Sequence, residues 1–465
     1  MAKKNNKSAA KSAKKRKTAK LKPADGTQGM EVIHSHAAGI DVGNEEHYVA
    51  VPPGLDENSV RTFGCFTEDL KAMAGWLSKI GVTTVALQST GVYWIPLYDV
   101  LTERGIHVFV VNARDTRNVP GRKTDVLECQ WIQKLHAHGL LQSSFRPGQE
   151  VCNMRTLWRQ RQQHVADAAR CTQRMQKALT QMNVQLHNVI SDITGVSGMT
   201  ILEAILQGER NPERLAELCQ PEIKASRATV TKSLEGNWRE EHLFVLRQEV
   251  QTYQHFQRMI EDCDAQLHQH FRSMEPKADP QALPKVERHK RPRGNAVESF
   301  DLRKELFRVV GVDLTRIDGI NIMTAQTVLS EIGYDVSAWQ TEGQFVSWLN
   351  LAPRDKISGG RVIGRDGRKI INRAGQALRL AANSLRQSDS YLGAQYRRLR
   401  GRLETSRANK AMGAKLARVI YRMLKYGQEY VDKGAEYYER NRKEQQFRNL
   451  TKQAAKLGYT ITKAA

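Results

Sequence analysis

Gly39-Ile40-Asp41-Val42-Gly43 is an apolar strand with one carboxylate inside it, and the predicted architecture extends outward from it. A carboxylate among apolar neighbours costs free energy unless it has a partner, so Asp41 is a candidate functional residue. After a turn at Gly43-Asn44, the run His47-Tyr48-Val49-Ala50-Val51 continues as a second strand, and a third is predicted around Val60 to Phe66. These three consecutive strands are therefore predicted to form an antiparallel sheet.

Helices and further strands follow in alternation. The remaining predicted elements are helices at Leu70 to Ile80, Trp94 to Arg104 and Asp125 to about His138, and strands at Thr83 to Leu87 and Ile106 to Val111. The two strands are near-continuous apolar runs, which is typical of central strands buried on both faces. The order β-β-β-α-β-α-β-α over residues 34–148 is that of an RNase H-like α/β domain.

Oxygen-bearing side chains accompany this predicted sheet. Asp125 and Glu128 are three residues apart in the first turn of a helix that Thr124 caps, so they project from one face. With Asp41 and Gln88 they form a candidate catalytic and metal-binding set, since hard divalent cations take oxygen ligands. Gln88 supplies an oxygen without a charge. The alternative for the helical pair is ordinary N-terminal acids favoured by the helix dipole.

Length and charge restrict the class of protein. A chain of 465 residues predicts two or three domains, and a net charge of +23 indicates a polyanionic partner, foremost nucleic acid. Residues 1–22 hold ten Lys or Arg and no acid, so we expect residues 1–33 to be a disordered basic tail. The tail is either a solubilising arm or a phosphate-binding arm. Subtracting the ten charges of residues 1–22 from +23 leaves +13, so the rest of the chain is basic too.

Membrane and secretory classes are not expected. No run approaches the roughly 20 apolar residues that span a bilayer, and no apolar segment follows the basic start. The six cysteines are scattered, which predicts free thiols in a reducing compartment and argues against a structural zinc site. They are Cys65, Cys129, Cys152, Cys171, Cys219 and Cys263. We therefore expect a cytoplasmic protein.

The middle of the chain, residues 149–275, is predicted to be a helical arm. Two apolar series with three-four spacing, Val165 to Val189 and Leu243 to Phe271, predict coiled-coil seams. Their polar entries, Thr172, Gln257 and Asp264, are candidates to fix the register. Either the two helices pack on each other within one chain, or the arm joins two protomers. Residues 276–304, which include Pro280, Pro284, Pro292 and a basic cluster, are predicted to be a linker.

Residues 305–432 are predicted to be a second compact, mostly helical region, followed by a charged tail at 433–465. Ile317-Asp318-Gly319-Ile320-Asn321, ahead of a helical run, resembles a helix-hairpin-helix, which presents backbone N–H groups to nucleic acid. Ser358-Gly359-Gly360 offers a nucleophile, with glycines that allow the backbone to approach a phosphate. Arg354, Lys356, Arg361 and Arg365 surround it, and Arg122 and Lys123 precede the acidic pair. The alternative is a flexible surface loop.

Several motifs together resemble the DEDD transposases of the IS-one-ten family. They are Gly39 to Gly43, Gln88-Ser89-Thr90-Gly91-Val92-Tyr93-Trp94, Asn112-Ala113-Arg114, Gly121-Arg122-Lys123-Thr124-Asp125, Phe345 to Leu351, Ala352-Pro353 and Ser358-Gly359-Gly360. The resemblance covers roughly residues 34–432, and Leu179-Thr180-Gln181-Met182-Asn183 is closest to the IS-eleven-eleven subgroup.

The resemblance implies a fold, a site and partners. The first domain would be similar to the Holliday-junction resolvase RuvC, with the acidic positions at Asp41, Gln88, Asp125 and Glu128 and the serine at Ser358. Gln88 and Glu128 depart from the D-E-D-D letters, and Gln88 puts one ligand of Mg²⁺ or Mn²⁺ in doubt. Members pair a noncoding bridge RNA, or seekRNA, with double-stranded donor and target DNA. They act as tetramers, dimers of dimers with composite sites, in the prokaryotic nucleoid.

The expected function is therefore RNA-guided DNA recombination through a covalent phosphoserine link. Ser358 would attack the scissile phosphate, which divalent metal at the acidic set binds. Two alternatives stay open: a metal-dependent junction nuclease without a covalent intermediate, and a catalytically weak nucleic-acid-binding protein.

Overall fold

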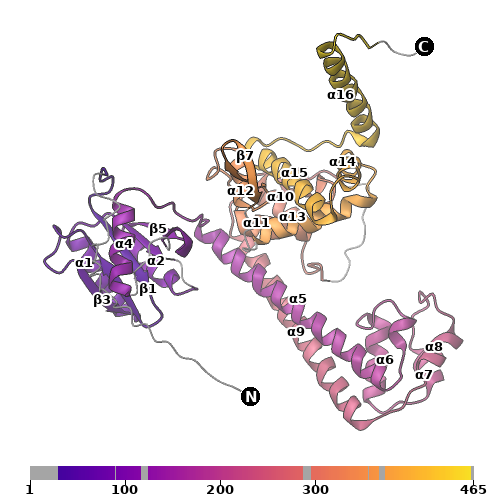
Figure 1. Ribbon diagram of the computed structural model, residues 1–465. Coiled ribbons are helices and arrows are strands. Elements are labelled where there is room, and N and C mark those ends of the chain that lie inside the picture. The colour runs from indigo at the N-terminus through magenta and orange to yellow at the C-terminus, as the bar shows by residue number, and fades with distance from the viewer. Residues whose placement is uncertain are drawn as a thin grey trace, which may run out of the picture. The chain divides into compact units, whose positions relative to one another are not determined.

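The computed structural model describes residues 30–88, 91–116, 124–285, 295–353, 355–365 and 372–461. The chain divides into two compact units, Met1–Arg146 and Pro147–Ala465 (Figure 1). Residues 1–29 of the predicted basic tail, Arg122, Lys123 and Arg354 lie outside the described residues, as does the basic cluster of the predicted linker.

A five-stranded mixed sheet forms the centre of the first unit. Its strands are β1 (Ala37–Val42), β2 (Glu46–Ala50), β3 (Val60–Gly64), β4 (Thr84–Gln88) and β5 (His107–Val111). They are ordered β3-β2-β1-β4-β5. β2 is antiparallel to β1 and β3, whereas β4 is parallel to β1 and β5. The predicted α/β class of this region is confirmed.

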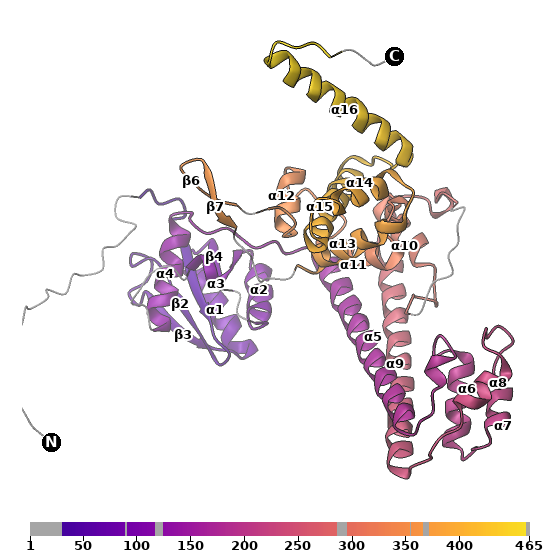
Figure 2. The same ribbon diagram turned by 45° about the vertical axis from the view of Figure 1, so that its right-hand side comes forward.

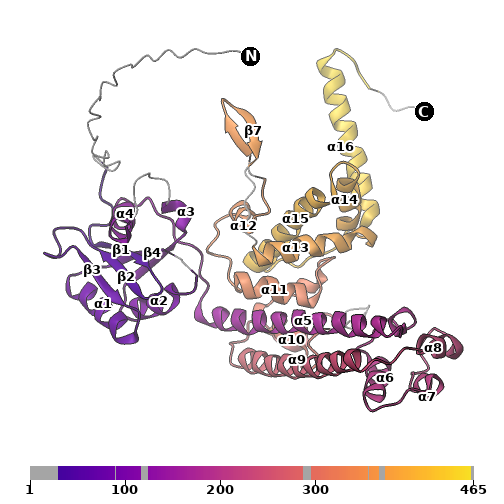
Figure 3. The ribbon, with the colours of Figure 1, turned by 60° about the horizontal axis from the view of Figure 1, so that its bottom comes forward.

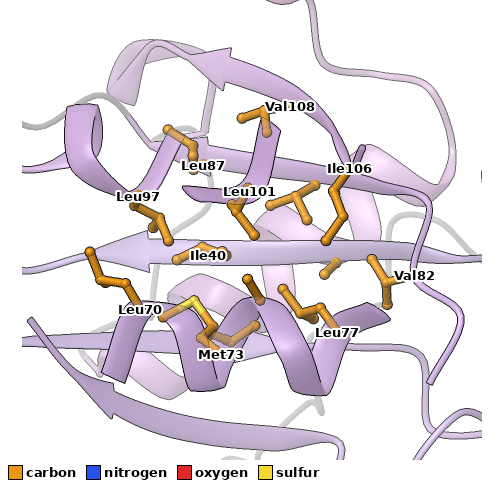
Figure 4. Packing of buried hydrophobic residues seen from close by; sticks show 14 of the residues in the cluster. Ile40, Leu70, Met73, Leu77, Val82, Leu87, Leu97, Leu101, Ile106 and Val108 are labelled. Carbon is orange, nitrogen blue, oxygen red and sulfur yellow. The ribbon is translucent and has the colours of Figure 1, made fainter. Parts of the chain in front are cut away.

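Alternate residues of β1 face opposite sides of the sheet. Ile40 packs with Leu87 and with the apolar faces of α1 (Thr67–Lys79) and α2 (Trp94–Glu103) in the main core (Figure 4). The opposite face is covered by α4 (Asp125–Ala137), whose Ile132 packs with Ala86 of β4. Figure 3 shows α4 on one side of the sheet and α1 with α2 on the other. The residues next to Ile40 therefore face α4.

The predicted elements of this unit agree with the structure to within a few residues. One helix was not predicted, the short α3 (Ala113–Thr116). It follows β5 directly and is too short for hydrophobic periodicity to reveal it.

The second unit contains two helices of 33 residues, α5 (Gln149–Gln181) and α9 (Glu240–Arg272), which pack along each other (Figure 2). Of the two predictions for the arm, the structure thus shows the hairpin within one chain. Arg161 and Asp264 are both buried between the helices and form a bidentate ion pair, with Nη2–Oδ2 at 3.1 Å. Of the three polar entries, Asp264 is thus the one that forms a buried ion pair between the two helices.

A small helical cap joins these two helices. It comprises α6 (Val196–Leu206), α7 (Pro212–Glu217) and α8 (Arg227–Ser233). Asn211 lies between α6 and α7, and its side chain caps α7 by accepting from the backbone N–H groups of Glu213 and Arg214. Apolar residues of the cap pack with the facing ends of α5 and α9 in one core.

The rest of the second unit is helical apart from one hairpin. Its elements are α10 (Leu302–Val310), α11 (Ile322–Ile332), α12 (Glu342–Trp348), β6 (Asp355–Ser358), β7 (Arg361–Arg365), α13 (Arg373–Ser384), α14 (Tyr391–Arg400), α15 (Thr405–Tyr426) and α16 (Gly434–Lys456). No described helix is long and apolar enough to span a membrane. All six cysteines are free, as predicted.

Two predictions for this region need correction. Ser358 lies on a β-hairpin rather than in an irregular loop, because Gly359 and Gly360 both take positive φ and close a tight turn. In the predicted helix-hairpin-helix, the helix directly ahead of the glycine turn is a single turn, Leu314–Arg316, and the longer α10 already ends at Val310. A Cβ at Gly319 would lie 3.0 Å from the carbonyl oxygen of Ala381, so this turn packs against α13.

Candidate active site

Asp41 and Gln88 lie at the same level of neighbouring parallel strands. Ile40 pairs with Leu87 in the β1–β4 register, and Asp41 and Gln88 are the next residues of the two strands. Both side chains follow residues that face the main core, so both face α4. The carboxyl ends of parallel strands are where α/β sheets place their functional groups.

The first turn of α4 brings two further carboxylates to this face. Thr124 caps the helix, with Oγ1 accepting from the backbone N–H of Leu127 at 3.4 Å, and Asp125 and Glu128 occupy the first turn. The helix lies unusually close to β1 because residue 39 is glycine. A Cβ there would lie 2.1 Å from the backbone nitrogen of Gln133 and 2.6 Å from the carbonyl oxygen of Cys129.

These carboxylates influence one another electrostatically. Partial burial, followed by the negative charges of Glu128 and Asp125, raises the pKa of Asp41 to about 6. Asp125 is exposed and Glu128 is half-buried, so the acidic face is open to solvent on the helix side. Repulsion among like charges is relieved by a bound cation, so the chemistry of these oxygen donors fits a hard divalent ion.

Gln88 is held by a side chain that no sequence pattern marks. The hydroxyl of Thr116, at the end of α3, donates to Gln88 Oε1 at 2.9 Å, and both residues are buried. One lone pair of the amide oxygen is therefore already used. The two residues are 28 positions apart, which is beyond the reach of helix or strand periodicity.

The described residues contain no group of three or more His, Cys, Asp or Glu side chains arranged to hold a metal ion. The predicted metal set is thus brought to one face, as three carboxylates and one amide, without converging on a ready-made cage. Mg²⁺ sites commonly use few carboxylates and complete the shell with water and substrate phosphate.

Ser358 belongs to the second unit and is exposed at the end of β6. It pairs with Arg361 across the Gly359-Gly360 turn, where φ is 56° and 74°. Glycine is required there by the backbone, because other residues rarely adopt positive φ. Lys356 and Arg361 are also exposed on the hairpin, whereas for Arg365 only the backbone, paired with Asp355, is described.

The hairpin presents apolar as well as basic side chains to solvent. Ile357, Val362 and Ile363 are 66%, 57% and 69% exposed. A two-stranded hairpin is marginally stable by itself, so these side chains are available to pack against a binding partner. Sequence inspection missed this feature because it predicted a loop.

Two family models match the chain. Residues 38–184 match the model DEDD_Tnp_IS110, described as a transposase, and residues 313–397 match a model described as the transposase IS116/IS110/IS902 family. The first match contains Asp41, Gln88, Asp125 and Glu128, and the second contains Ser358. No curated protein matches the chain. Both segments are thus similar to transposase domains.

Proposed function

We propose that the protein is an insertion-sequence transposase that exchanges DNA strands through a serine nucleophile. The proposal rests on the presence of two features in the same chain. An acidic face lies within the segment similar to DEDD transposases, and an exposed serine flanked by cations lies within the segment similar to a second transposase model. The net charge of +23 suits DNA as the partner.

The first unit would bind the scissile phosphate. We assign it an RNase H-like fold, supported by the strand order and by the helix across β1. Asp41, Asp125 and Glu128, with Gln88, would hold Mg²⁺ or Mn²⁺, which supplies electrostatic stabilisation of the charge that develops on the phosphate oxygens. The N-terminal turn of α4 also directs the positive end of its helix dipole toward this face, which favours negative charge there.

Ser358 would be linked covalently to the DNA strand during exchange. Its Oγ bonds to phosphorus while one phosphorus–oxygen bond of the DNA backbone breaks, and the departing sugar hydroxyl takes up a proton while the serine gives one up. Bond number is conserved, so rejoining needs no nucleotide triphosphate. Lys356 and Arg361 would neutralise the phosphate oxygens beside the nucleophile, together with Arg354 and Arg365.

A direct test uses the intact protein with Ser358→Ala. Wild type incubated with Mg²⁺ and cognate DNA should give a covalent protein–DNA adduct that survives denaturing electrophoresis. The adduct should be absent for Ser358→Ala and present for Ser406→Ala, an exposed serine of the same unit. An adduct that persists in Ser358→Ala would refute the assignment.

The finer parts of the proposal follow from the family resemblance. They are membership of the IS-eleven-eleven subgroup, guidance by a bridge RNA, and assembly of four copies in which one copy's acids act with another's serine. The exposed apolar residues of the hairpin support an assembly of this kind. Sequencing RNA that copurifies from the native host tests guidance: a discrete structured species encoded beside the gene is expected, and random cellular RNA would count against it.

A second candidate is a nucleic-acid-binding protein with weak or no strand-cleaving activity. The observation in its favour is Gln88, a neutral residue whose oxygen already accepts from Thr116. Titrating Mg²⁺ into a DNA-cleavage assay separates the two functions. Cleavage that rises and saturates with metal supports the transposase, whereas tight binding without cleavage at any concentration supports the second candidate.

A further inference from the structure

An arginine-lined pocket lies between α14 and α16, apart from the serine hairpin. Its volume is about 390 Å³. The charged side chains that line it are Arg397, Arg398, Arg402, Arg442 and Glu439. Figure 3 shows α16 beginning beside α14 and extending away from it. The second family match ends at residue 397, so most of the residues that line the pocket lie beyond it.

The charges of the pocket are unbalanced. Four guanidinium groups face one carboxylate, and that carboxylate, Glu439, already pairs with Arg442 at 3.3 Å. Among the described residues, Arg398 and Arg402 have no acidic partner. The Nε of Arg442 is buried and has no hydrogen-bond acceptor. A buried donor without an acceptor costs about 1–3 kcal/mol, so an anion that reached this group would be stabilised by it.

A purely structural role explains only part of this arrangement. Cations in the last turn of a helix stabilise its dipole, and Arg397 does donate to the carbonyl oxygen of Ser388. Capping the end of α14 does not require Arg442, which comes from another helix, nor does it satisfy the Arg442 Nε. The remaining guanidinium groups converge on a space that no other carboxylate of the described chain fills.

We propose that this pocket binds a backbone phosphodiester of nucleic acid and so fastens α16 to α14. The planar guanidinium group matches phosphate oxygens in a bidentate geometry, and several around one cavity favour a phosphate over a monovalent anion. The inference rests on the proposed function for its source of phosphate, which is either the DNA or a guide RNA.

The packing of α16 explains why a ligand would matter. None of its described residues is buried. An aromatic contact, Tyr391 with Tyr438 at 5.0 Å between ring centres, joins its first turns to α14. A helix that buries none of its residues opens at low free-energy cost. A phosphate shared by the two helices raises that cost, so nucleic-acid binding orders α16.

The test compares two double variants of the full-length protein. Arg398→Gln with Arg402→Gln removes two pocket charges, whereas Arg448→Gln with Lys452→Gln removes two charges from the exposed far part of α16. Affinity for a random-sequence DNA duplex and for an RNA hairpin is measured by fluorescence anisotropy at several salt concentrations. Circular dichroism checks that both variants fold.

The pocket variant should bind about tenfold more weakly, and its salt slope should fall by about one to two, since each neutralised phosphate contributes about 0.9 for duplex DNA. The control should change less than threefold. The probe that loses affinity, DNA or RNA, identifies the source of the phosphate. Equal effects of the two double variants on both probes would show a general charge effect. They would refute phosphate binding at the pocket.

Hydrogen exchange is a second measurement, and a general loss of positive charge would not by itself change its result. Amides in the first half of α16 should exchange more slowly when nucleic acid binds to wild type or to the control, but not in the pocket variant. No protection in wild type would overturn the proposal. Ser358→Ala should keep this protection while losing the covalent adduct, so the failure of the chemistry and the failure of the pocket are distinguishable.

Discussion

Replacing Gly39 with alanine tests how the acidic face is built. The added Cβ would lie 2.1 Å from the backbone nitrogen of Gln133, where ordinary contacts begin at 3.4 Å. Both groups in conflict are backbone, so no side chain can rotate away. α4 must therefore retreat from β1 by about 1 Å, and it carries Asp125 and Glu128 away from Asp41 as it moves.

The size of two effects follows from this displacement. Overpacking of this kind costs about 1–3 kcal/mol of stability. A misplacement of about 1 Å in a catalytic group lowers turnover by roughly 10²-fold. The variant should therefore lose both stability and, under the proposed function, most of its DNA cleavage. The pKa of Asp41 should move back toward its ordinary value as the two negative charges recede.

The assay measures hydrogen exchange in β1 and α4, thermal unfolding, and Mg²⁺-dependent cleavage. Gly54→Ala is the matched control, because no atom lies within 4 Å of a Cβ at this exposed position. Faster exchange confined to the α4–β1 interface, with the control unchanged, is expected. If Gly39→Ala unfolds and cleaves like Gly54→Ala, then close contact between helix and strand does not position the acids.

Three further predictions concern other contacts. Arg161→Met should destabilise the α5–α9 hairpin by about 3–5 kcal/mol, because it leaves Asp264 buried and unpaired; the double variant Arg161→Met with Asp264→Leu should recover most of this in thermal unfolding. Burial, and then two neighbouring histidines, lower the pKa of His136 from 6.5 to about 4. The unfolded chain therefore binds a proton that the folded chain does not take up, so stability should fall by up to about 3 kcal/mol between pH 6.5 and 4, and His136→Gln should flatten this slope in urea titrations. Gln88→Glu keeps the acceptor for Thr116 and adds a charge, so half-maximal cleavage should need roughly tenfold less Mg²⁺; an unchanged requirement would show that this residue is not a ligand.

Much of the candidate site is evident from local sequence patterns. Asp41 is marked by its apolar strand, and the pair Asp125 and Glu128 by its three-residue spacing behind a capping threonine. Both signals are local, because side-chain periodicity and helix capping depend on residues only a few positions apart. Ser358 is selected in the same way, although the pattern around it predicts a loop where the chain forms a hairpin.

Other contacts have no local signal. Thr116 reaches Gln88 across 28 residues, Arg161 reaches Asp264 across 103, and Arg442 comes from a separate helix to join the pocket beside α14. Gly39 is evident in the sequence, but the close packing of α4 against this residue is not.

Local patterns in the chain are thus sufficient for the succession of strands and helices, the basic charge, the long helical pair and the residue types available for phosphate chemistry. They are not sufficient for the face of β1 that the carboxylate occupies, for the close approach of α4 to that strand, or for the convergence of guanidinium groups beside α14. Short-range periodicity fixes secondary structure, whereas the distance between side chains remote in sequence depends on the packing of whole elements, which emerges only when the chain is folded.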